Sequence, residues 1–589
     1  MVAMNFRLFD TQTFFRLVVV GGLLATSASQ TPSVEAFFPS STSTSTSKPI
    51  LQHSTIPKAD TVTFKSRRIA SSISTDNGNG NASSGSTSSR RKKKISTIPG
   101  RRTSPRFLSF LFDDSIKLLS PKTMGTYQTK TARKYQSPIF KTNIFFQPTV
   151  VVTSQDYVDK IFYEESKHKG CLVPAFPPHH HTLFGPKSVI VQKGDYHARL
   201  RRLLQPSLSP VAIQSYRPMI ESSIKEFVRS LQQERSQENS RAVLVPKIRP
   251  FFVSLAVQIL LGTGTDGDNT NTASSSPLST SEQKDLADEL TIWSKGLLSA
   301  PLTFIPWSTS SKAMRARKRI ASRLQKMIDE ERSSQQHQQQ QEKQPVRSGG
   351  MGLLRGMMTS CDPETGEYLN DDEIIDNILT FVFAGSDTTA SAATSLWLVL
   401  TLYPNVKKVV RDDPSKLETL IQKVLSVYPP APFAMRQVQK QIQIDDCGGG
   451  SDNDGGISYV IPEHWQIVYG FYGILESRRS KEGVGDNNNN NNSKNEDEDN
   501  DDEASKSKME EWLLDDLSSS TSPPPSAFGG GPRMCPGRFL AMEELKSFGK
   551  FLVQNELEWT LDPIDQDLES KYTPGYFPVD GLSIRFQYN

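Results

Sequence analysis

The sequence is poor in the features that mark several large protein classes. Its four cysteines stand far apart in 589 residues, at Cys171, Cys361, Cys447 and Cys535. This spacing excludes a disulfide framework and a CxxC zinc site. The net charge is only +4, so overall charge gives no reason to expect a nucleic-acid partner. Hydrophobic residues make up 36%, too few for a polytopic membrane protein, yet 30 Phe, 15 Tyr and 6 Trp can build a large core.

The first 104 residues have the composition of targeting sequence. Residues 1–36 predict a signal peptide, because the apolar run 17–25 is too short to cross about 30 Å of hydrocarbon. An uncleaved anchor is the weaker alternative. Residues 37–104 are rich in Ser and Thr and hold twelve Lys or Arg against two Asp, which is typical of an organelle transit peptide. A disordered basic linker, or a nuclear signal in the RRKKK run at 90–94, is the alternative.

Together these two segments resemble the plastid presequence of algae with secondary plastids. In that presequence Phe comes first after the cut, and the sequence VEAF at 34–37 places Phe37 in this position. We therefore predict a plastid location, with the endoplasmic reticulum membrane as the alternative.

Residues 105–589 predict one folded domain with three low-complexity inserts. Residues 265–282 are rich in Ser, Thr, Asn and Asp, residues 333–349 are rich in Gln, and 480–509 contain an Asn run and an acidic run. Such segments lack the apolar surface that offsets the entropy of ordering a chain. We expect all three to be disordered loops.

Helical patterns dominate this domain, so the fold class is mostly α with small β-sheets. Residues 139–145 and 149–153 predict a β-hairpin that turns at Gln147-Pro148. Further along, several apolar residues share one helix face: Ile375, Ile378, Leu379, Val382 and Phe383. The apolar pattern continues to Leu400, which predicts one long, mostly buried helix.

The segment FGGGPRMCPG at 528–537 is the most informative about chemistry. Its three glycines permit a tight turn before Cys535. An amphipathic helix follows, with Phe539, Met542, Leu545, Phe548 and Leu552 on its buried face. A cysteine at a helix N-terminus is biased towards the thiolate, which is a strong axial ligand of haem iron. Arg533 could pair with a haem propionate. The alternative is a buried cysteine in a glycine-rich turn.

The sequence AGSDTT at 384–389 lies inside the long predicted helix. Ala384 and Gly385 leave room for a flat cofactor. The Thr388 hydroxyl can bond the Ala384 carbonyl and open the helix locally, which would leave a groove for O₂ and water. Asp387 and Thr388 would then stand where protons must be delivered. Close helix packing is the alternative reading of such small residues.

A basic helix is expected at 194–204. His197 and Arg201 are four residues apart on one face, so together they could clamp a propionate. The alternative is a solvated basic helix, because Arg199 and Arg202 are also present.

These segments resemble the cytochrome P-450 family. Its haem signature FxxGxRxCxG is matched at 528–537, and its oxygen-binding motif AGx(D/E)T at 384–388. The resemblance covers essentially all of 105–589 and implies a long central helix over haem b, with the cysteine loop on the proximal side. It implies that Cys535 binds the iron, Phe528 contacts the cofactor, and Thr388 and Asp387 relay protons. Four residues would hold propionates: His197, Arg201, Arg436 and Arg533.

The resemblance is greatest to the clan that oxidises retinoids, sterols and related isoprenoids. It implies a monooxygenase that inserts one oxygen atom from O₂ into a hydrophobic, isoprenoid-derived substrate. The chain has no flavin or iron–sulfur motif, so electrons would come from a ferredoxin in a plastid or a flavoprotein reductase in the endoplasmic reticulum. Peripheral membrane contact is left open. The alternatives are an isomerase or dehydratase that uses no O₂, and a haem-binding protein without turnover.

The chain departs from the family at the Glu-x-x-Arg motif, where Lys423 and Ser426 stand instead. Lys423 and Glu511 could form a charge-reversed pair. The fold could also hold without the network, because a buried ion pair can be replaced at little cost. An impaired enzyme or a sequence error is the third possibility. A literal Glu-x-x-Arg at 476–479 lies beyond the Pro-Pro element and is not equivalent.

Three adjacent histidines, His179, His180 and His181, could suggest a metal site. Adjacent side chains do not point at one centre in either a helix or a strand. We therefore expect a polar loop near the substrate entrance.

Overall fold

The computed structural model describes residues 94–587. Its longer gaps are 102–112, 234–240, 263–278, 341–351, 446–456, 482–497 and 518–526, with gaps of one or two residues elsewhere. The predicted signal peptide, most of the transit-like segment and part of each insert lie outside the described residues. All elements named below belong to one unit that begins at Lys93.

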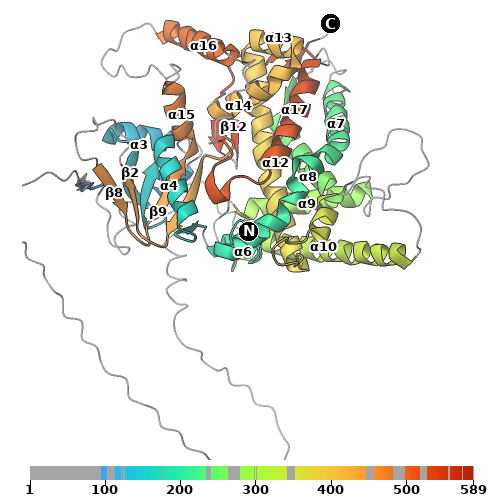
Figure 1. Cartoon of the computed structure of the whole chain (residues 1–589). Helices are drawn as coiled ribbons and strands as arrows, with labels where there is room; N and C mark the ends of the chain where they lie inside the picture. Colours follow the sequence, from blue (N-terminus) through green and yellow to red (C-terminus); the bar gives the residue numbers. More distant parts are fainter. Residues whose placement is uncertain are drawn as a thin grey trace, which may run out of the picture. The chain divides into compact units, whose positions relative to one another are not determined.

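Helices form most of this unit (Figure 1). They are α2 (Ser115–Leu119), α3 (Tyr127–Tyr135), α4 (Gln155–Lys167), α5 (Pro178–Phe184), α6 (Gly194–Leu204), α7 (Pro210–Gln233), α8 (Val245–Leu261), α9 (Thr280–Leu297), α10 (Thr309–Gln340), α11 (Leu353–Thr359), α12 (Asp371–Leu402), α13 (Pro404–Asp412), α14 (Leu417–Val427), α15 (Phe471–Lys481), α16 (Glu498–Leu514) and α17 (Arg538–Gln554). Short 3₁₀ turns occur at η2 (Pro206–Leu208), η4 (Pro414–Lys416) and η5 (Gly531–Arg533).

The strands are short: β1 (Lys94–Ser96), β2 (Ile139–Ile144), β3 (Gln147–Val152), β4 (Leu172–Pro174), β5 (Arg241–Val243), β6 (Phe433–Val438), β7 (Ile442–Asp445), β8 (Ile457–Ile461), β9 (Gln466–Gly470), β10 (Trp559–Leu561), β11 (Ser570–Tyr572), β12 (Tyr576–Pro578) and β13 (Ser583–Phe586). The main sheet has the order β2-β3-β9-β6-β4. Three smaller sheets have the orders β1-β8-β7, β10-β13-β5 and β11-β12.

The predicted hairpin is confirmed, but its turn is two residues earlier than expected. Strands β2 and β3 pair antiparallel from Ile139–Val152 to Ile144–Gln147. Phe145 and Phe146 form the turn, both with positive φ. Their N–H groups donate to Ser115 Oγ and Asp113 Oδ2, each at 2.6 Å. These distant acceptors fix the turn, and Pro148 is left inside β3.

The long predicted helix is confirmed as α12. The Asn370 side chain accepts from the Glu373 N–H at 3.0 Å, and Glu373 accepts in return from the Asn370 N–H, which makes a capping box. Three acids in the first turn complement the helix dipole. The helix ends just before Pro404, which begins α13. Helices α8 and α17 both pack against α12 (Figure 1).

Two inserts are shorter than predicted. Helix α10 continues through Gln340, so the first part of the Gln-rich segment is helical. Gln is a good helix former, and extension of an existing helix avoids the cost of a new nucleus. Helix α16 likewise covers 498–509, where the acidic run lies at the helix N-terminus, the end of the dipole that favours carboxylates.

The folded part also begins earlier than residue 105. Strand β1 pairs in parallel with β8, Ile98 is buried, and Gly100 bridges Lys141. Residues 94–101 therefore belong to the folded unit and not to a disordered presequence.

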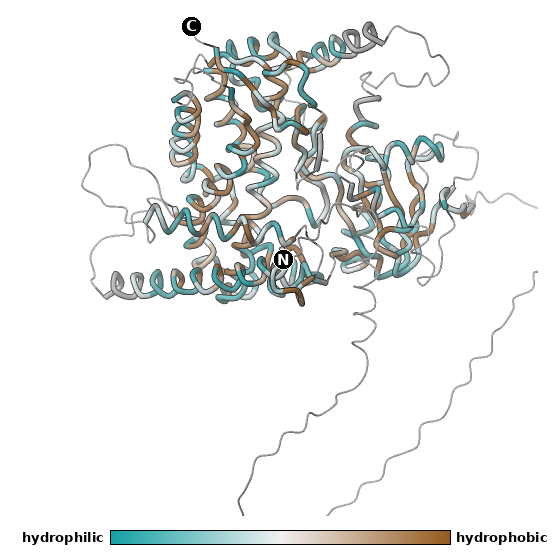
Figure 2. The backbone as a smooth tube through the Cα atoms, turned by 180° about the vertical axis from the view of Figure 1, so that it is seen from behind, coloured by the Kyte–Doolittle hydropathy of each residue, from teal (hydrophilic) through white to brown (hydrophobic). Residues whose placement is uncertain are grey.

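The core has three regions. The larger one lies among the helices around α12, and the smaller ones cover the two faces of the main sheet. Hydrophobic segments lie mainly along these inner helices and strands (Figure 2). The helical region and the sheet meet at the site described next.

Candidate active site

A cavity of about 320 Å³ lies between α12, α8, the sheet and the cysteine loop. Most of its wall is apolar, with Ala256, Ile259, Val382 and Ala434 among the lining residues. Few polar side chains reach it. The ones used below are Thr388, Thr389, Arg436, Arg533, Cys535 and Glu544.

The cysteine loop forms one wall of the cavity. Gly529 and Gly531 have φ values of 71° and 61°, which explains why glycine is needed in this turn. The Cys535 N–H donates to the Phe528 carbonyl at 2.9 Å and closes the loop. Phe528, Arg533 and Cys535 all line the cavity, as the motif predicts.

The sequence predicts that Cys535 favours the thiolate form, but the surrounding protein groups, without a bound metal ion, favour the neutral thiol. Burial raises the pKa of the thiol, although the Gly537 N–H and the charges of Arg201 and Arg538 act in the opposite direction. Burial is the larger effect because Cys535 stands three residues before α17 begins, away from most of its N–H groups. A metal ion bound to the sulfur would deprotonate it.

The helix after Cys535 is confirmed as α17, with one change to its buried face. Leu545, Phe548 and Leu552 are buried in the core. Phe539 is 40% exposed and lies under the Arg538 guanidinium, 4.2 Å from the ring centroid. Phe539 therefore lies outside the buried face of the helix, although Leu540 and Ala541 of the same turn line the cavity.

Helix α12 forms another part of the cavity wall. Ala384, Gly385, Thr388 and Thr389 line the cavity. The Thr388 hydroxyl donates to the Ala384 carbonyl, as the four-residue spacing predicts. The helix nevertheless stays continuous from Asp371 to Leu402, so this bond does not break it.

Asp387 faces a different direction from Thr388. Its carboxylate accepts from Arg249 of α8, at 3.1 Å from Nε and 3.0 Å from Nη2. Burial raises the pKa of Asp387, and Arg249 offsets part of that rise. Asp387 does not line the cavity in the described structure. Any proton that it relays must pass through other groups.

The four predicted propionate ligands come together. Arg436 and Arg533 line the cavity. Burial, together with the charges of Arg533, Arg201 and Arg436, lowers the pKa of His197 to about 3. Burial and the Arg436 charge lower the pKa of Arg533 to about 10. Positive groups from α6, β6 and the cysteine loop are therefore close enough to repel one another.

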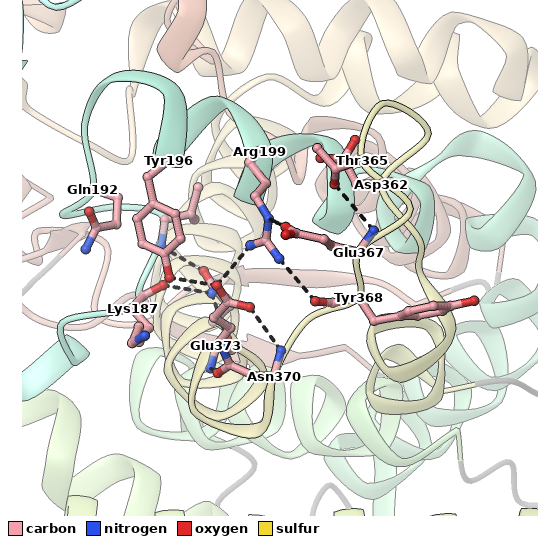
Figure 3. A network of polar contacts seen from close by, with 12 residues as sticks. Lys187, Gln192, Tyr196, Arg199, Asp362, Thr365, Glu367, Tyr368, Asn370 and Glu373 are labelled. Carbon is pink, nitrogen blue, oxygen red and sulfur yellow. Dashed lines mark hydrogen bonds and ion pairs between the residues drawn. The ribbon is translucent and has the colours of Figure 1, made fainter.

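The other face of α6 contacts the start of α12 (Figure 3). Arg199 donates to Glu367 at 2.7 Å and to Glu373 at 2.9 Å, and Tyr196 donates to Glu373 at 2.7 Å. Arg202 donates to Asp362. The helix is therefore not a solvated basic helix, because Arg199 and Arg202 pair with acids on this side. Arg201 lies close enough for its charge to act on Arg533 and Cys535, but neither Arg201 nor His197 is among the described residues that line the cavity.

These residues fit haem. Among the described residues, the carboxylate whose charge acts on Arg436 and Arg533 is Glu165, which lies 3.5 Å from Arg436. Arg436 Nε is buried without a hydrogen-bond partner among the described residues. Two unbalanced positive charges suit the two propionates. Gly385 and Gly537 both line the cavity, and a Cβ at either position would meet nothing within 4 Å, so open space beside each of them leaves room for a flat ring.

Lys423 makes a contact different from the predicted pair with Glu511. Its ammonium donates to the main-chain carbonyls of Trp512, at 2.6 Å, and Asp515, and it lies 5.0 Å from the Trp512 ring centroid. Glu511 is exposed. Lys423 thus caps the C-terminal end of α16, where the helix dipole favours a cation.

The literal Glu-x-x-Arg at 476–479 has another role, as expected. Glu476 of α15 forms an ion pair with Arg133 of α3. The predicted loop at the three histidines is wrong, because 179–181 lie in α5. Burial lowers the pKa of His180 to about 3, and no cluster of His, Cys, Asp or Glu in the described chain could hold a metal ion.

The motif reading missed two residues of the site. Arg249 is, with Lys247, one of two cations in the otherwise apolar α8, and Glu544 lies three residues after Ala541 and four before Phe548 on the inner face of α17. Both are charged residues within apolar patterns, which is a signal that the sequence alone contains. The residues that they face, Asp387 and Thr389 of α12, are more than a hundred residues away and could not be inferred from that signal.

The comparisons with known proteins agree with this geometry. A family model described as cytochrome P450 matches residues 105–422, more than half of the chain. The chain belongs to the cytochrome P450 family, the fold class is confirmed, and the cofactor of this family is haem b.

Similar curated proteins include a plant hydroxylase and an animal cytochrome P450. Abscisic acid 8'-hydroxylase 2 of Oryza sativa subsp. indica is 24% identical over 341 residues, which is 57% of each chain. Cytochrome P450 26A1 of Danio rerio is 25% identical over 474 residues, 76% of this chain and 83% of that protein. The solved structure of retinoic acid bound cyanobacterial CYP120A1 shares the fold, with a TM-score of 0.60, 22% identity, and coverage of 84% of this chain and 100% of that one.

Proposed function

We propose that this protein is a haem-thiolate monooxygenase that inserts one oxygen atom from O₂ into a hydrophobic, isoprenoid-derived substrate. One observation carries this proposal: Cys535 of the cysteine loop and Thr388 of α12 line the same apolar cavity. Relatives named for abscisic acid hydroxylation and for bound retinoic acid support the isoprenoid class. The Thr388 hydroxyl also favours oxygen chemistry over isomerisation or dehydration, which need no such proton relay.

The residues of this chain divide the work as follows. Haem held by Cys535, with its propionates on Arg201, Arg436, Arg533 and His197, would supply O₂ activation. The apolar wall binds and orients the substrate and excludes water, which strengthens polar interactions inside. Thr388 holds a hydroxyl at the oxygen side of the cavity, and Asp387 stays tied to Arg249 behind it.

The test is spectral and chemical. Reduced protein with CO should show the Soret band of a thiolate ligand, and Cys535→Ala should lose it while Cys361→Ala, at an exposed cysteine, should keep it. Incubation with ¹⁸O₂, an electron donor and isoprenoid extracts should place one labelled oxygen in a product. If the thiolate band is present but no labelled product forms, the protein binds haem without acting as a monooxygenase, and the proposal is wrong.

Electron delivery and location are part of the same proposal. Because the chain carries no flavin or iron–sulfur motif, a ferredoxin would reduce it in a plastid. A fusion of residues 1–92 to a fluorescent protein should enter the plastid of a secondary-plastid alga, and Phe37→Ala should stop it at an outer membrane. Retention of the unchanged fusion in the endoplasmic reticulum would favour that compartment and a flavoprotein reductase.

Peripheral membrane contact is supported by one turn. Phe304 and Trp307, between α9 and α10, are 73% and 77% exposed, and Lys312 and Arg315 follow nearby. Aromatic and basic residues together suit a lipid interface. Within the described residues, no helix is both long and apolar enough to pass through a bilayer. Flotation with anionic vesicles should occur and should be lost in a Phe304→Ser, Trp307→Ser variant.

A further inference from the structure

Glu165 is a buried carboxyl group at the end of α4 to which the roles above assign no function. It is 5% exposed and follows Tyr157 and Ile161 at four-residue intervals on the buried face of the helix. An acidic residue at a position where helix periodicity calls for an apolar one is costly to bury without a partner. Its neighbour Glu164 is different, because Glu164 is only partly buried and pairs with the exposed His168 at 3.6 Å.

The partner of Glu165 is Arg436 of β6. Glu165 Oε1 lies 3.5 Å from Arg436 Nε, and Arg436 Nη1 donates to the Met435 carbonyl at 3.1 Å. The guanidinium lies over the ring of Tyr469 in the neighbouring strand β9, 5.7 Å from its centroid. Arg436 and Tyr469 line the cavity, whereas Glu165 is not among the described residues that do. Glu165 therefore acts on the cavity through Arg436.

This contact leaves polar atoms available. Arg436 Nε, Glu165 Oε2 and the Tyr469 hydroxyl are buried without a hydrogen-bond partner among the described residues. Buried polar atoms are rarely left in this way, and three of them here belong to residues that act on one another. The carboxylate thus holds one edge of Arg436 by charge without saturating the guanidinium, which can still bind an anion from the cavity side.

The charges around Arg436 add up to a simple balance. Arg533 of the cysteine loop and Arg201 of α6 bring two further guanidiniums, and both Arg436 and Arg201 act on Arg533. Burial raises the pKa of Glu165, and the charges of Arg436 and Arg533 oppose that rise. Ionised Glu165 and two propionates would together equal the three arginines. A net charge costs more in such a site than in water, because the surroundings have a low dielectric constant.

The other titratable groups near Glu165 keep their charge state at neutral pH. Burial and the Glu165 charge raise the pKa values of Tyr469 and Cys171, so both remain protonated. The charged groups of α4 and of the elements packed against it have contacts elsewhere: Lys160 with the Asp445 carbonyl, Glu164 with His168, and Glu476 with Arg133. Among the described groups at this end of the cavity, Glu165 is the one whose charge can change and act directly on Arg436.

We propose that Glu165 is a positioning residue for haem, which holds Arg436 towards the propionates and supplies the third negative charge that balances the three arginines. The proposal rests on haem binding and not on the oxygen chemistry proposed above. When Glu165 is protonated, one positive charge beside the cofactor is left without compensation. A positive charge favours the reduced iron, so the reduction potential should fall as the pH rises and Glu165 ionises.

Spectroelectrochemical titration of the haem-loaded protein tests the charge balance without turnover. Across a range from about pH 5 to about pH 9, the potentials of wild type and Glu165→Gln should converge at the acidic end. Towards the alkaline end, the wild-type potential should fall below that of the variant. Glu165→Asp keeps the charge and should keep the pH dependence, and the control Glu164→Gln should follow wild type. A wild-type potential that is not below that of Glu165→Gln at the alkaline end overturns the proposal.

Release of haem to excess apomyoglobin tests the positioning of Arg436 and needs only partly loaded protein. Glu165→Gln should release haem several-fold faster than wild type does. It should release haem dimethyl ester, whose propionates carry no charge, at close to the wild-type rate. Equal acceleration for both compounds, or no acceleration for haem, would mean that Glu165 only supports the fold of this wall, and the proposal would be wrong. Neither measurement uses O₂ or a substrate, so both can succeed while the monooxygenase proposal fails.

Discussion

At the scale of single residues, the site depends on hydroxyl and charged groups placed against an apolar wall. The Thr388 hydroxyl lies on that wall and donates to the Ala384 carbonyl, and its other side faces the cavity. Thr388→Ala should keep haem but divert electrons to peroxide, with product per electron pair reduced on the order of tenfold or more.

The matched control for this prediction is in the same helix. Thr394 makes the same kind of bond, to the Ala390 carbonyl at 2.8 Å, but does not line the cavity. Thr394→Ala should leave the peroxide share unchanged. Equal uncoupling in both variants would mean that helix distortion, and not the cavity hydroxyl, controls proton delivery.

Glu544 also predicts a stability effect that depends on pH. Its pKa is raised from an ordinary 4.5 to about 8 in the folded protein, so only the unfolded state ionises between these values. The stability due to this group is therefore fully present below about pH 4.5 and is lost as the pH rises to about 8. The loss is on the order of a few kcal/mol. Denaturant unfolding of Glu544→Gln should show a flatter pH dependence across this window than wild type.

At the scale of elements, Lys423 replaces a lost network with a helix cap. Lys423→Met keeps most of the aliphatic stem but removes both bonds to the end of α16, and should lower the free energy of unfolding by about 1–3 kcal/mol. Haem retention should fall with it. The control is Lys546→Met, which removes the ion pair with Glu418 of α14. It should lower the free energy of unfolding by less, because this pair is exposed to solvent.

The same geometry predicts that a charge swap will not rescue Lys423. Lys423→Glu should be harmful because a carboxylate would face two carbonyl oxygens. Adding Glu511→Arg should not restore haem, and the two changes should be additive within about 0.5 kcal/mol in thermal or denaturant unfolding. Recovery in the double variant would mean that Glu511 does reach Lys423.

The elements show which sequence signals were sufficient. The cysteine loop, the hairpin and α12 were predictable because glycines, caps and apolar periodicity act within a few residues. The turn at Phe145 and Phe146 was not, because its acceptors come from Asp113 and Ser115. Arg249, Lys423 and Glu544 likewise act through partners distant in sequence. Composition also could not show that α10 and α16 extend into polar segments, because these segments have no apolar pattern from which a helix could be predicted.

At the scale of the whole molecule, the 480–509 insert divides into two parts with different consequences. Residues 484–495 contain the Asn run and lie outside the described residues, whereas α16 begins at Glu498 and ends where Lys423 caps it. Deleting 484–495 should hardly change haem content or melting temperature, because loop closure costs only about 0.6 kcal/mol per doubling of length.

Deleting 484–507 should lower both the haem content and the melting temperature. Only 508–514 of α16 would remain, a helix too short to be stable alone, and its end carries the carbonyl and the Trp512 ring that Lys423 contacts. A third variant, with 484–495 replaced by an equal length of Gly and Ser, separates loop length from loop composition and should match wild type. If the longer deletion retained full haem and stability, the cap on α16 would have no part in holding the site together.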